Sequence, residues 1–228
     1  SERIASVMDR LGAEEGEVIE HGMVTKSIER AQKKVEARNF EMRKHVLDYD
    51  DVMNQQRQVI YNRRHDLLER ESAHELIEEM IEDLIDHVLI THANSEGHAE
   101  EWDWDGMQIE FGSTFFLGFT VSEEDRAEMP YEELRAHLTR TVQEAYQRRL
   151  DTVGVEVFRQ VEKAIALHTI DTCWQEHLQE MDELKDGIGF VGVGGKNPLI
   201  EYKKGAFDIF ESLIDRISQE TLKNLFQL

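Results

Sequence analysis

An all-α fold is predicted for this chain: a long helix, an acidic helical segment and an antiparallel pair of helices joined by a short turn. Three observations predict it. The chain has only two prolines, Pro130 and Pro198, that could interrupt a helix. Neither glycine nor proline occurs between positions 23 and 96. Apolar residues recur at helical spacing over most of the 228 positions, and the 40% hydrophobic content is enough for at least one sizeable core.

Residues 1–22 are predicted to be the end of a preceding domain and a linker. A short helical pattern runs from Ile4 to Leu11 and stops at Gly12, a residue type that commonly ends helices. Because the chain starts inside this pattern, we expect it to be a piece of a longer protein.

Residues 23–70 are predicted to form one unbroken helix from about position 25, with a length of roughly 70 Å at about 1.5 Å per residue. Its apolar residues fall in two sevenfold series: Ile28, Val35, Met42 and Tyr49, and then Val46, Met53, Ile60 and Leu67. Such a change of series is expected in a straight helix whose neighbours change along its length. The register of the heptads shifts between the two series, and Gln56 and Arg63 interrupt them where the first series would continue, which argues against a simple coiled coil.

Residues 71–140 are predicted to be an acidic, mainly helical domain. They contain nineteen Asp and Glu against three Arg, a net charge of −16, within a chain whose total is −22. A surface of this kind repels nucleic acid and anionic lipid, so no nucleic-acid partner is expected. An amphipathic helix is predicted from Leu76 to Leu89, ending near 94–97.

The aromatic and glycine-rich stretch 102–121 is ambiguous by pattern. Its apolar centre is at 115–119, and we expect either a loop folded onto the acidic domain or a short strand pair.

Residues 141–228 are predicted to form the helical hairpin. A helix that starts near Tyr131 is interrupted at Gly154, and a long amphipathic stretch then runs to Gly187. A glycine-rich turn leads to Pro198 and a last amphipathic helix. Two long helices joined by a short turn pack antiparallel.

The turn of the hairpin has a superficial likeness to a phosphate-binding loop. Such a loop needs G-x-x-x-x-G-K-[ST], in which backbone amides surround phosphates and a hydroxyl holds magnesium. With Gly195 and Lys196 as the G-K pair, Phe190 stands where the first glycine belongs, and Asn197 stands where the hydroxyl belongs. We therefore expect no nucleotide binding in this chain. Apolar residues in a turn instead indicate a contact surface.

No metal, cofactor or catalytic site is predicted. Two sets of side chains have nominal ligand chemistry: His168, Asp171, Cys173 and His177, and His87, His92 and His98. Neither set matches a common closed metal site, and Cys173 beside Trp174 is expected to be a small buried apolar residue. No nucleophile with an evident base occurs, so we expect this fragment not to be an enzyme.

The setting predicted for the protein is cytoplasmic. Cys173 is the single cysteine, which excludes an internal disulfide and favours a reducing compartment. No apolar run approaches eighteen residues, and no basic-then-apolar leader is present, so neither a membrane span nor a secretory leader is expected.

Two stretches of the long helix carry a specific resemblance to a known family. They are AQKKVEARNF at 31–40 and RKHVLDYDDVMNQQR at 43–57, and both closely resemble the scaffold helix of the SecA preprotein translocase ATPases. The segments at 1–4 and 19–26 resemble the exit from that family's second nucleotide-binding domain. The segments at 167–178, 187–188 and 197–203 resemble its two-helix finger, so the resemblance covers essentially the whole chain.

The resemblance implies a mechanical function in protein transport. In that family the scaffold helix braces the nucleotide-binding and preprotein-binding domains, and the helical wing packs alongside. The two-helix finger enters the cytoplasmic mouth of the SecY channel, contacts the moving preprotein and helps restrain ATP hydrolysis. The implied partners are the SecY channel complex, unfolded preprotein and the protein's own nucleotide-binding and preprotein-binding domains. The implied location is the cytoplasm and the cytoplasmic face of the cell membrane.

The resemblance also assigns residues. The implied finger tip, in contact with preprotein and channel, consists of Phe190, Val191, Gly192, Val193, Gly194, Gly195 and Lys196. The implied interdomain positions of the scaffold are Arg43, Tyr49, Asp50, Asp51, Asn54 and Arg57. Val193 stands where the family usually has a bulky aromatic residue. ATP and Mg²⁺ are implied for the full-length protein, with the ATP-binding motifs before Ser1.

A helical adaptor of another class is the alternative hypothesis. Such a protein would bind partners through its hairpin without any motor. ATP-binding motifs in the upstream coding sequence would discriminate between the two.

Overall fold

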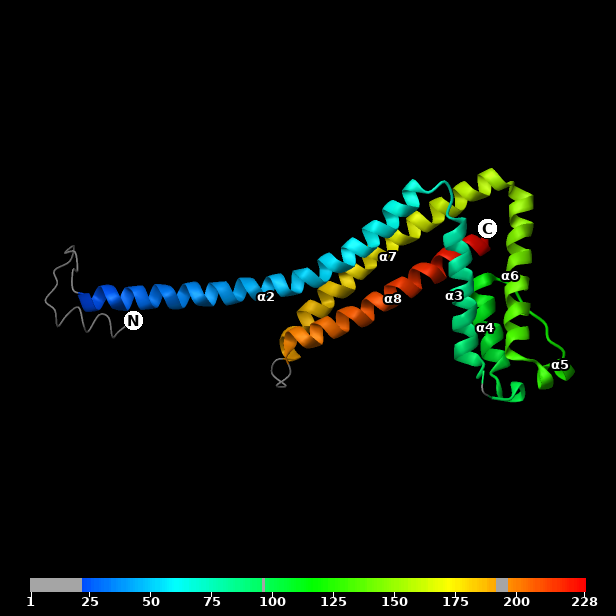
Figure 1. The fold of residues 1–228 in the computed structure, drawn as a ribbon, viewed down its shortest axis with the longest axis horizontal. Helices are drawn as coiled ribbons and strands as arrows, with labels where there is room; N and C mark the ends of the chain where they lie inside the picture. Colours follow the sequence, from blue (N-terminus) through cyan, green and yellow to red (C-terminus); the bar gives the residue numbers. More distant parts are fainter. Residues whose placement is uncertain (1–21, 96, 192–196) are drawn as a thin grey trace. The chain divides into compact units, whose positions relative to one another are not determined.

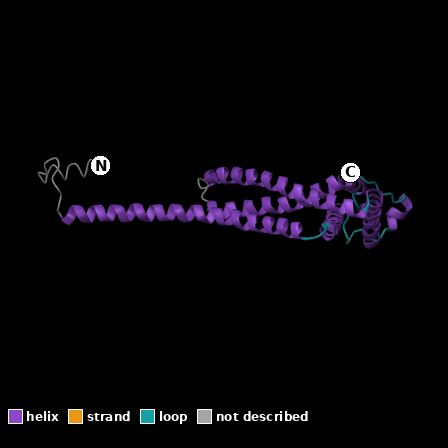
Figure 2. Cartoon of the chain, turned by 90° about the horizontal axis from the view of Figure 1, so that it is seen from above, coloured by secondary structure: helices purple, strands orange, loops and turns teal. Residues whose placement is uncertain are grey.

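The structure of the chain, a computed structural model, describes residues 22–95, 97–191 and 197–228 (Figure 1). These ranges are mainly helical, with short loops between the helices, and no strand occurs within them, which confirms the all-α prediction (Figure 2). The chain divides into two compact units, residues 1–51 and residues 52–228. No helix in the described ranges is both long enough and apolar enough to cross a bilayer.

The long helix is α2 (Gly22–Glu69), and its 48 residues are continuous, as the lack of glycine and proline predicts. Within the first unit its large apolar side chains are exposed: Ile28, Val35, Phe40, Met42, Val46 and Leu47. Within the second unit Ile60 and Leu67 are buried, and Met53 packs against the same core. Of the two sevenfold series, only the second therefore contributes to a core in this structure.

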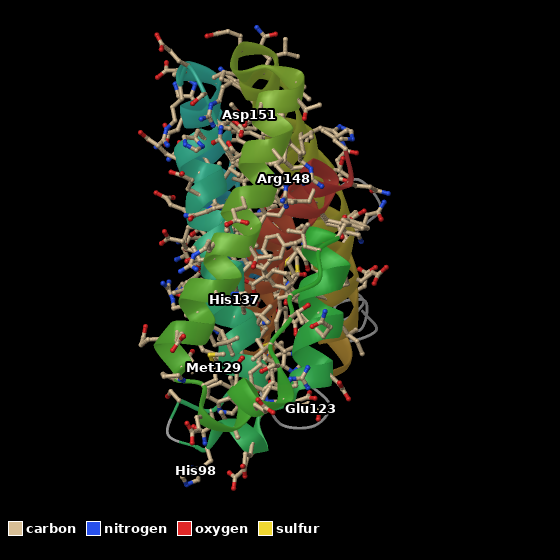
Figure 3. All side chains as sticks on the ribbon, turned by 90° about the vertical axis from the view of Figure 1, so that its right-hand side faces the viewer. His98, Glu123, Met129, His137, Arg148 and Asp151 are labelled. Atoms are coloured by element: carbon tan, nitrogen blue, oxygen red, sulfur yellow. The ribbon has the colours of Figure 1, made fainter. Side chains whose placement is uncertain are left out.

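The second unit is built from the end of α2 and the helices that follow it. These are α3 (His74–His92), a 3₁₀ turn (Ala99–Glu101), α4 (Trp104–Phe115), α5 (Glu123–Glu128), α6 (Tyr131–Val153), α7 (Val155–Val191) and α8 (Pro198–Gln227). Helix α3 packs against α4, α6, α7 and α8 (Figure 1). A single apolar core lies between these helices. Helix α6 extends along the acidic domain, with Met129 just before its start and Arg148 and Asp151 near its end (Figure 3).

The prediction of a loop or a strand pair at 102–121 is wrong, because α4 occupies most of it. Trp104, Met107, Phe111, Thr114 and Phe115 are the buried residues of α4, and their spacing is helical. Asp103 caps the helix by accepting a hydrogen bond from the amide of Gly106 at 2.9 Å. Two internal glycines and a dense group of aromatic residues hid this period in the sequence.

Helices α7 and α8 form an antiparallel pair (Figure 1). Leu184 of α7 lies beside Gly205 of α8, and Arg216 of α8 pairs with Glu180 of α7. The predicted stop at Gly187 is wrong, since α7 continues to Val191. A glycine inside a helix costs only about 1 kcal/mol, and the buried Ile188 is next to it. A Cβ at Gly205 would lie 2.9 Å from Cδ1 of Leu184, so a larger residue there would require the Leu184 side chain to move.

The domain boundaries that the sequence suggested stay predictions. The boundary at 70/71 falls in the connection between α2 and α3, and the boundary at 140/141 falls inside α6.

Candidate functional site

The predicted finger tip lies largely outside the described residues. Residues 192–196 are not described, and only the backbone of Phe190 and Val191, in the last turn of α7, is described. Their contact with preprotein and channel stays a prediction.

The predicted interdomain positions are distributed along α2. Arg43, Asp50, Asp51, Asn54 and Arg57 are exposed, and Tyr49 is half-buried. Three of these side chains form short-range hydrogen bonds on their own helix: Arg43 Nε donates to the carbonyl of Asn39 at 3.3 Å, and Arg57 donates to Asn54 Oδ1 at 2.9 Å. The structure does not gather the six into one cluster, and their interdomain role stays a prediction.

The structure does reveal a polar joint where α2 packs on the hairpin of α7 and α8. Its centre is Gln56, a polar residue that is only 7% exposed. Its Nε2 donates to the carbonyl of Ala206 on α8 at 2.8 Å, and its Oε1 lies 2.9 Å from Nε2 of His177 on α7. One carboxamide therefore links three helices.

The hydrogen bonds of Gln56 determine the tautomer of His177. Because the amide nitrogen faces a carbonyl, the amide oxygen faces His177, and the Nε2 of that ring must carry the proton. The other ring nitrogen, Nδ1, is buried and has no hydrogen-bond partner. Burial lowers the pKa of His177 below its ordinary value. The charge of Arg216 lowers this pKa further, and the charge of Glu180 opposes the shift without reversing it. The ring is held neutral between Trp174 and Phe210, with centroid distances of 5.2 and 5.8 Å.

An ion pair and an aromatic contact extend the joint along α2. Arg64 donates through Nε to Asp171 Oδ1 at 2.8 Å and through Nη2 to Oδ2 at 3.2 Å. This two-point geometry aligns the guanidinium with the carboxylate. Tyr61 meets Trp174 edge to face, with ring centroids 6.4 Å apart. The two α2 polar residues of the joint, Gln56 and Arg64, thus lie on the face that carries Ile60 and Leu67.

The hairpin itself is fastened by Arg216 of α8. Its guanidinium donates to Glu180 of α7 at 2.7 Å, and Nε lies 3.9 Å from Glu176. The hydrogen bond with Glu180 raises the pKa of Arg216, although burial lowers it. The pair keeps the two helices of the hairpin together away from the turn.

Residues considered above as nominal metal ligands have other partners or surroundings. Asp171 binds Arg64, His177 binds Gln56, and Cys173 is buried, as expected of a small apolar residue. Burial raises the pKa of the Cys173 thiol. His92 bridges Asp103 and Glu110 at 2.9 and 2.7 Å. Among the residues that the structure describes, no group of three or more His, Cys, Asp or Glu side chains is arranged to hold a metal ion.

A second buried polar cluster lies where α3, α6 and α7 meet, and sequence reasoning missed it. The carboxylate of Glu162 is fully buried and accepts hydrogen bonds from the hydroxyl of Tyr146 and from Arg159. The Tyr146 hydroxyl also lies 3.0 Å from Nδ1 of His74. Burial, and then the hydrogen bond with Glu162, raise the pKa of Tyr146 far above its ordinary value. The only sequence signal for a buried Glu162 was its position beside Val161 and Ile165 in the apolar pattern of α7.

This fold and this joint define a class: an all-helical scaffold in which a long helix is fixed to a helical hairpin by buried polar contacts. Residues 18–228 match the family model described as the SecA wing and scaffold domain. The chain is 41% identical to the protein translocase subunit SecA of Syntrophobacter fumaroxidans over 228 residues, which are 100% of this chain and 27% of that protein. It is 43% identical to SecA of Geobacter metallireducens over 226 residues, 99% of this chain and 25% of that protein.

A third relative is the protein translocase subunit SecA of Pelotomaculum thermopropionicum, 42% identical over 228 residues, 100% of this chain and 26% of that protein. The chain belongs to the SecA family. It spans about a quarter of the length of these curated relatives.

Proposed function

We propose that this chain is the mechanical scaffold and two-helix finger of a SecA translocase motor. In this proposal it couples ATP hydrolysis, performed by domains of the same protein outside the fragment, to the movement of preprotein through the SecY channel. The observation that carries the proposal is the match to the SecA wing and scaffold family over residues 18–228. The fragment supplies no catalytic residue, and ATP and Mg²⁺ are cofactors of the full-length protein only.

Two structural features support a mechanical function. Helix α2 is continuous, so its backbone hydrogen bonds can pass a displacement along its axis. The part of α2 in the second unit is fixed to α7 and α8 by Gln56 and Arg64. In the proposed mechanism a displacement of α2 reaches the hairpin through these contacts, which do not depend on the tip.

The exposed apolar residues of α2 in the first unit support the assignment of partners. Ile28, Val35 and Met42 are each more than half exposed and follow one sevenfold series. A continuous apolar series on a long helix suits packing against other domains. We assign it to the protein's own nucleotide-binding and preprotein-binding domains. The SecY channel and unfolded preprotein are the partners of the finger, at the cytoplasmic face of the cell membrane.

The proposal is tested on the full-length protein. It should co-purify with the SecY channel, and the amount retained should differ with and without ATP. Val193→Asp should impair preprotein transport much more than it alters folding, because a charge pressed against an apolar partner must be desolvated. Basal ATPase should survive, and Val193→Tyr should be tolerated or improve coupling.

A matched control is Val157→Asp, which makes the same change at a site that is 54% exposed and far from the tip along α7. It should transport normally. If Val193→Asp transports as well as this control, and crosslinks from Phe190 reach neither channel nor preprotein, the finger function is wrong.

A further inference from the structure

The apolar contacts of α2 with the hairpin allow two alignments. Val46, Met53, Ile60 and Leu67 are spaced by seven residues. If α2 moved along its axis by one such repeat, about 10.5 Å at about 1.5 Å per residue, the first three would occupy the places of the last three. These three places would still hold apolar side chains; the contact of Trp174 with Tyr61, which is 54% exposed, would be lost, because Asn54 would replace Tyr61. Burial of apolar surface alone therefore discriminates poorly between the two alignments.

The ion pair of the joint repeats with the same period. Arg57 precedes Arg64 by seven residues and is exposed. After the same movement Arg57 would lie beside Asp171, where Arg64 now donates two hydrogen bonds. The charged contact therefore does not distinguish the two alignments either.

Gln56 breaks this symmetry. Seven residues before it stands Tyr49, so the movement would place a phenol where the carboxamide now lies. The place is closed, since His177 and Ala206 are fully buried. A phenol is larger, and it lacks the separate nitrogen and oxygen that meet the Ala206 carbonyl and His177 Nε2 simultaneously. Polar groups left buried without partners oppose the movement.

We infer that Gln56 fixes the register of α2 on the hairpin, excluding an alternative register displaced by one sevenfold repeat. A single buried polar residue among apolar positions of a helical interface is known to specify register in this way. The inference deepens the proposed function, and its consequence for transport rests on that function. If α2 could adopt two registers, a given displacement of α2 would not move the hairpin by a defined distance.

The connection between α2 and α3 is a second restraint. The displaced register would require residues 63–69 to leave the helix, and it would break the hydrogen bonds from Lys163 to the carbonyls of Leu68 and Arg70, at 2.8 and 2.7 Å. A test of Gln56 must therefore relax this connection first. Seven Gly and Ser residues inserted between Glu71 and Ser72 would do so.

The experiment measures register directly in the 228-residue chain with that insertion and with Cys173→Ser. Spin labels are placed at the exposed positions Asn62→Cys and Glu183→Cys. With Gln56 present, one distance is expected. The double variant Gln56→Leu, His177→Leu leaves no polar group of that pair behind, so it should fold while populating a second distance longer by about 10 Å. Gln55→Leu, a change at the exposed neighbour, should give the single distance.

A single native distance in the double variant would overturn the inference. If that variant does not fold, as seen by circular dichroism, Gln56→Tyr decides in the chain without the insertion. It should lower Tm by about 5 °C or more, whereas Gln55→Tyr should not. A Gln56→Tyr variant as stable as the parent chain would also overturn the inference. None of these readouts involves transport. A single register in the double variant would therefore overturn the inference about Gln56 but not the proposed function, and a failure of the full-length protein to bind SecY would overturn the proposed function but not the inference.

Discussion

Replacing one isoleucine of α2 in each unit by alanine should show that the part of α2 in the second unit contributes to stability and the exposed part in the first unit does not. Ile60 is 1% exposed and lies in the core of the second unit, whereas Ile28 is 55% exposed in the first. Ile60→Ala removes about three buried carbons, worth roughly 0.8 kcal/mol each, and leaves a cavity. We expect the free energy of unfolding of the second unit to fall by about 2–5 kcal/mol. Ile28→Ala should change stability by less than about 0.5 kcal/mol.

Urea unfolding of the two variants provides the assay. All three tryptophans, Trp102, Trp104 and Trp174, belong to the second unit, so their fluorescence reports its unfolding. Circular dichroism at 222 nm reports the helices of both units. An Ile28→Ala variant as destabilised as Ile60→Ala, or an unaffected Ile60→Ala variant, would refute the reasoning from burial.

The full-length protein extends the comparison. If the protein's own domains cover the exposed series of α2, Ile28→Ala should destabilise the full-length protein more than it destabilises this chain. An equally small effect in both would count against that assignment of partners.

Three further predictions concern the backbone, pH and nucleotide. Met53→Pro should cost about 3 kcal/mol or more and uncouple the parts of α2 on either side, because it removes a helical hydrogen bond and clashes with the preceding turn; amide exchange across the site would detect this. Burial lowers the pKa of His92, but hydrogen bonds with Glu110 and Asp103 outweigh it and raise the pKa above 6.5. The stability advantage over His92→Gln should therefore be complete below pH 6.5 and disappear as pH rises through the folded-state pKa, in urea titrations at several pH values. Calorimetry of this chain with Mg-ATP should show no heat of binding, and micromolar binding dependent on Lys196 would contradict the scaffold assignment.

The long elements of the fold were predictable because their sequence signals are local. The region between Gly22 and Gly97 lacks helix-breaking residues, and the sevenfold series gave the face of α2 that packs in the second unit. Helix α4 was missed because glycines at 106 and 112 lower helix propensity, while its aromatic residues suit strands equally well. Asp103, three residues before Gly106, was the cap that could have indicated a helix start.

The polar joint could be predicted only in part. Gln56 was recognisable as an interruption of an apolar series, but its partners lie 121 and 150 residues away in the sequence. Nothing local indicates that an interrupting residue is buried and paired instead of exposed. His177 illustrates the converse, since its ligand chemistry suggested a metal, while in the structure its protonated nitrogen faces a carboxamide.

The ends of two helices depend on side chains that come from elsewhere in the chain. Lys163 of α7 binds the carbonyl of Leu68 in the last turn of α2 and that of Arg70 just after the helix, and Arg149 of α6 binds a carbonyl near the end of α8. Neither helix has a basic residue in its own last turn. These terminal turns can therefore become stable only after loops of many tens of residues have closed, which carries an entropic cost before any contact is gained. During folding, the last turns of α2 and α8 should consequently be among the later parts to become protected from exchange, although both belong to helices whose middles can form early.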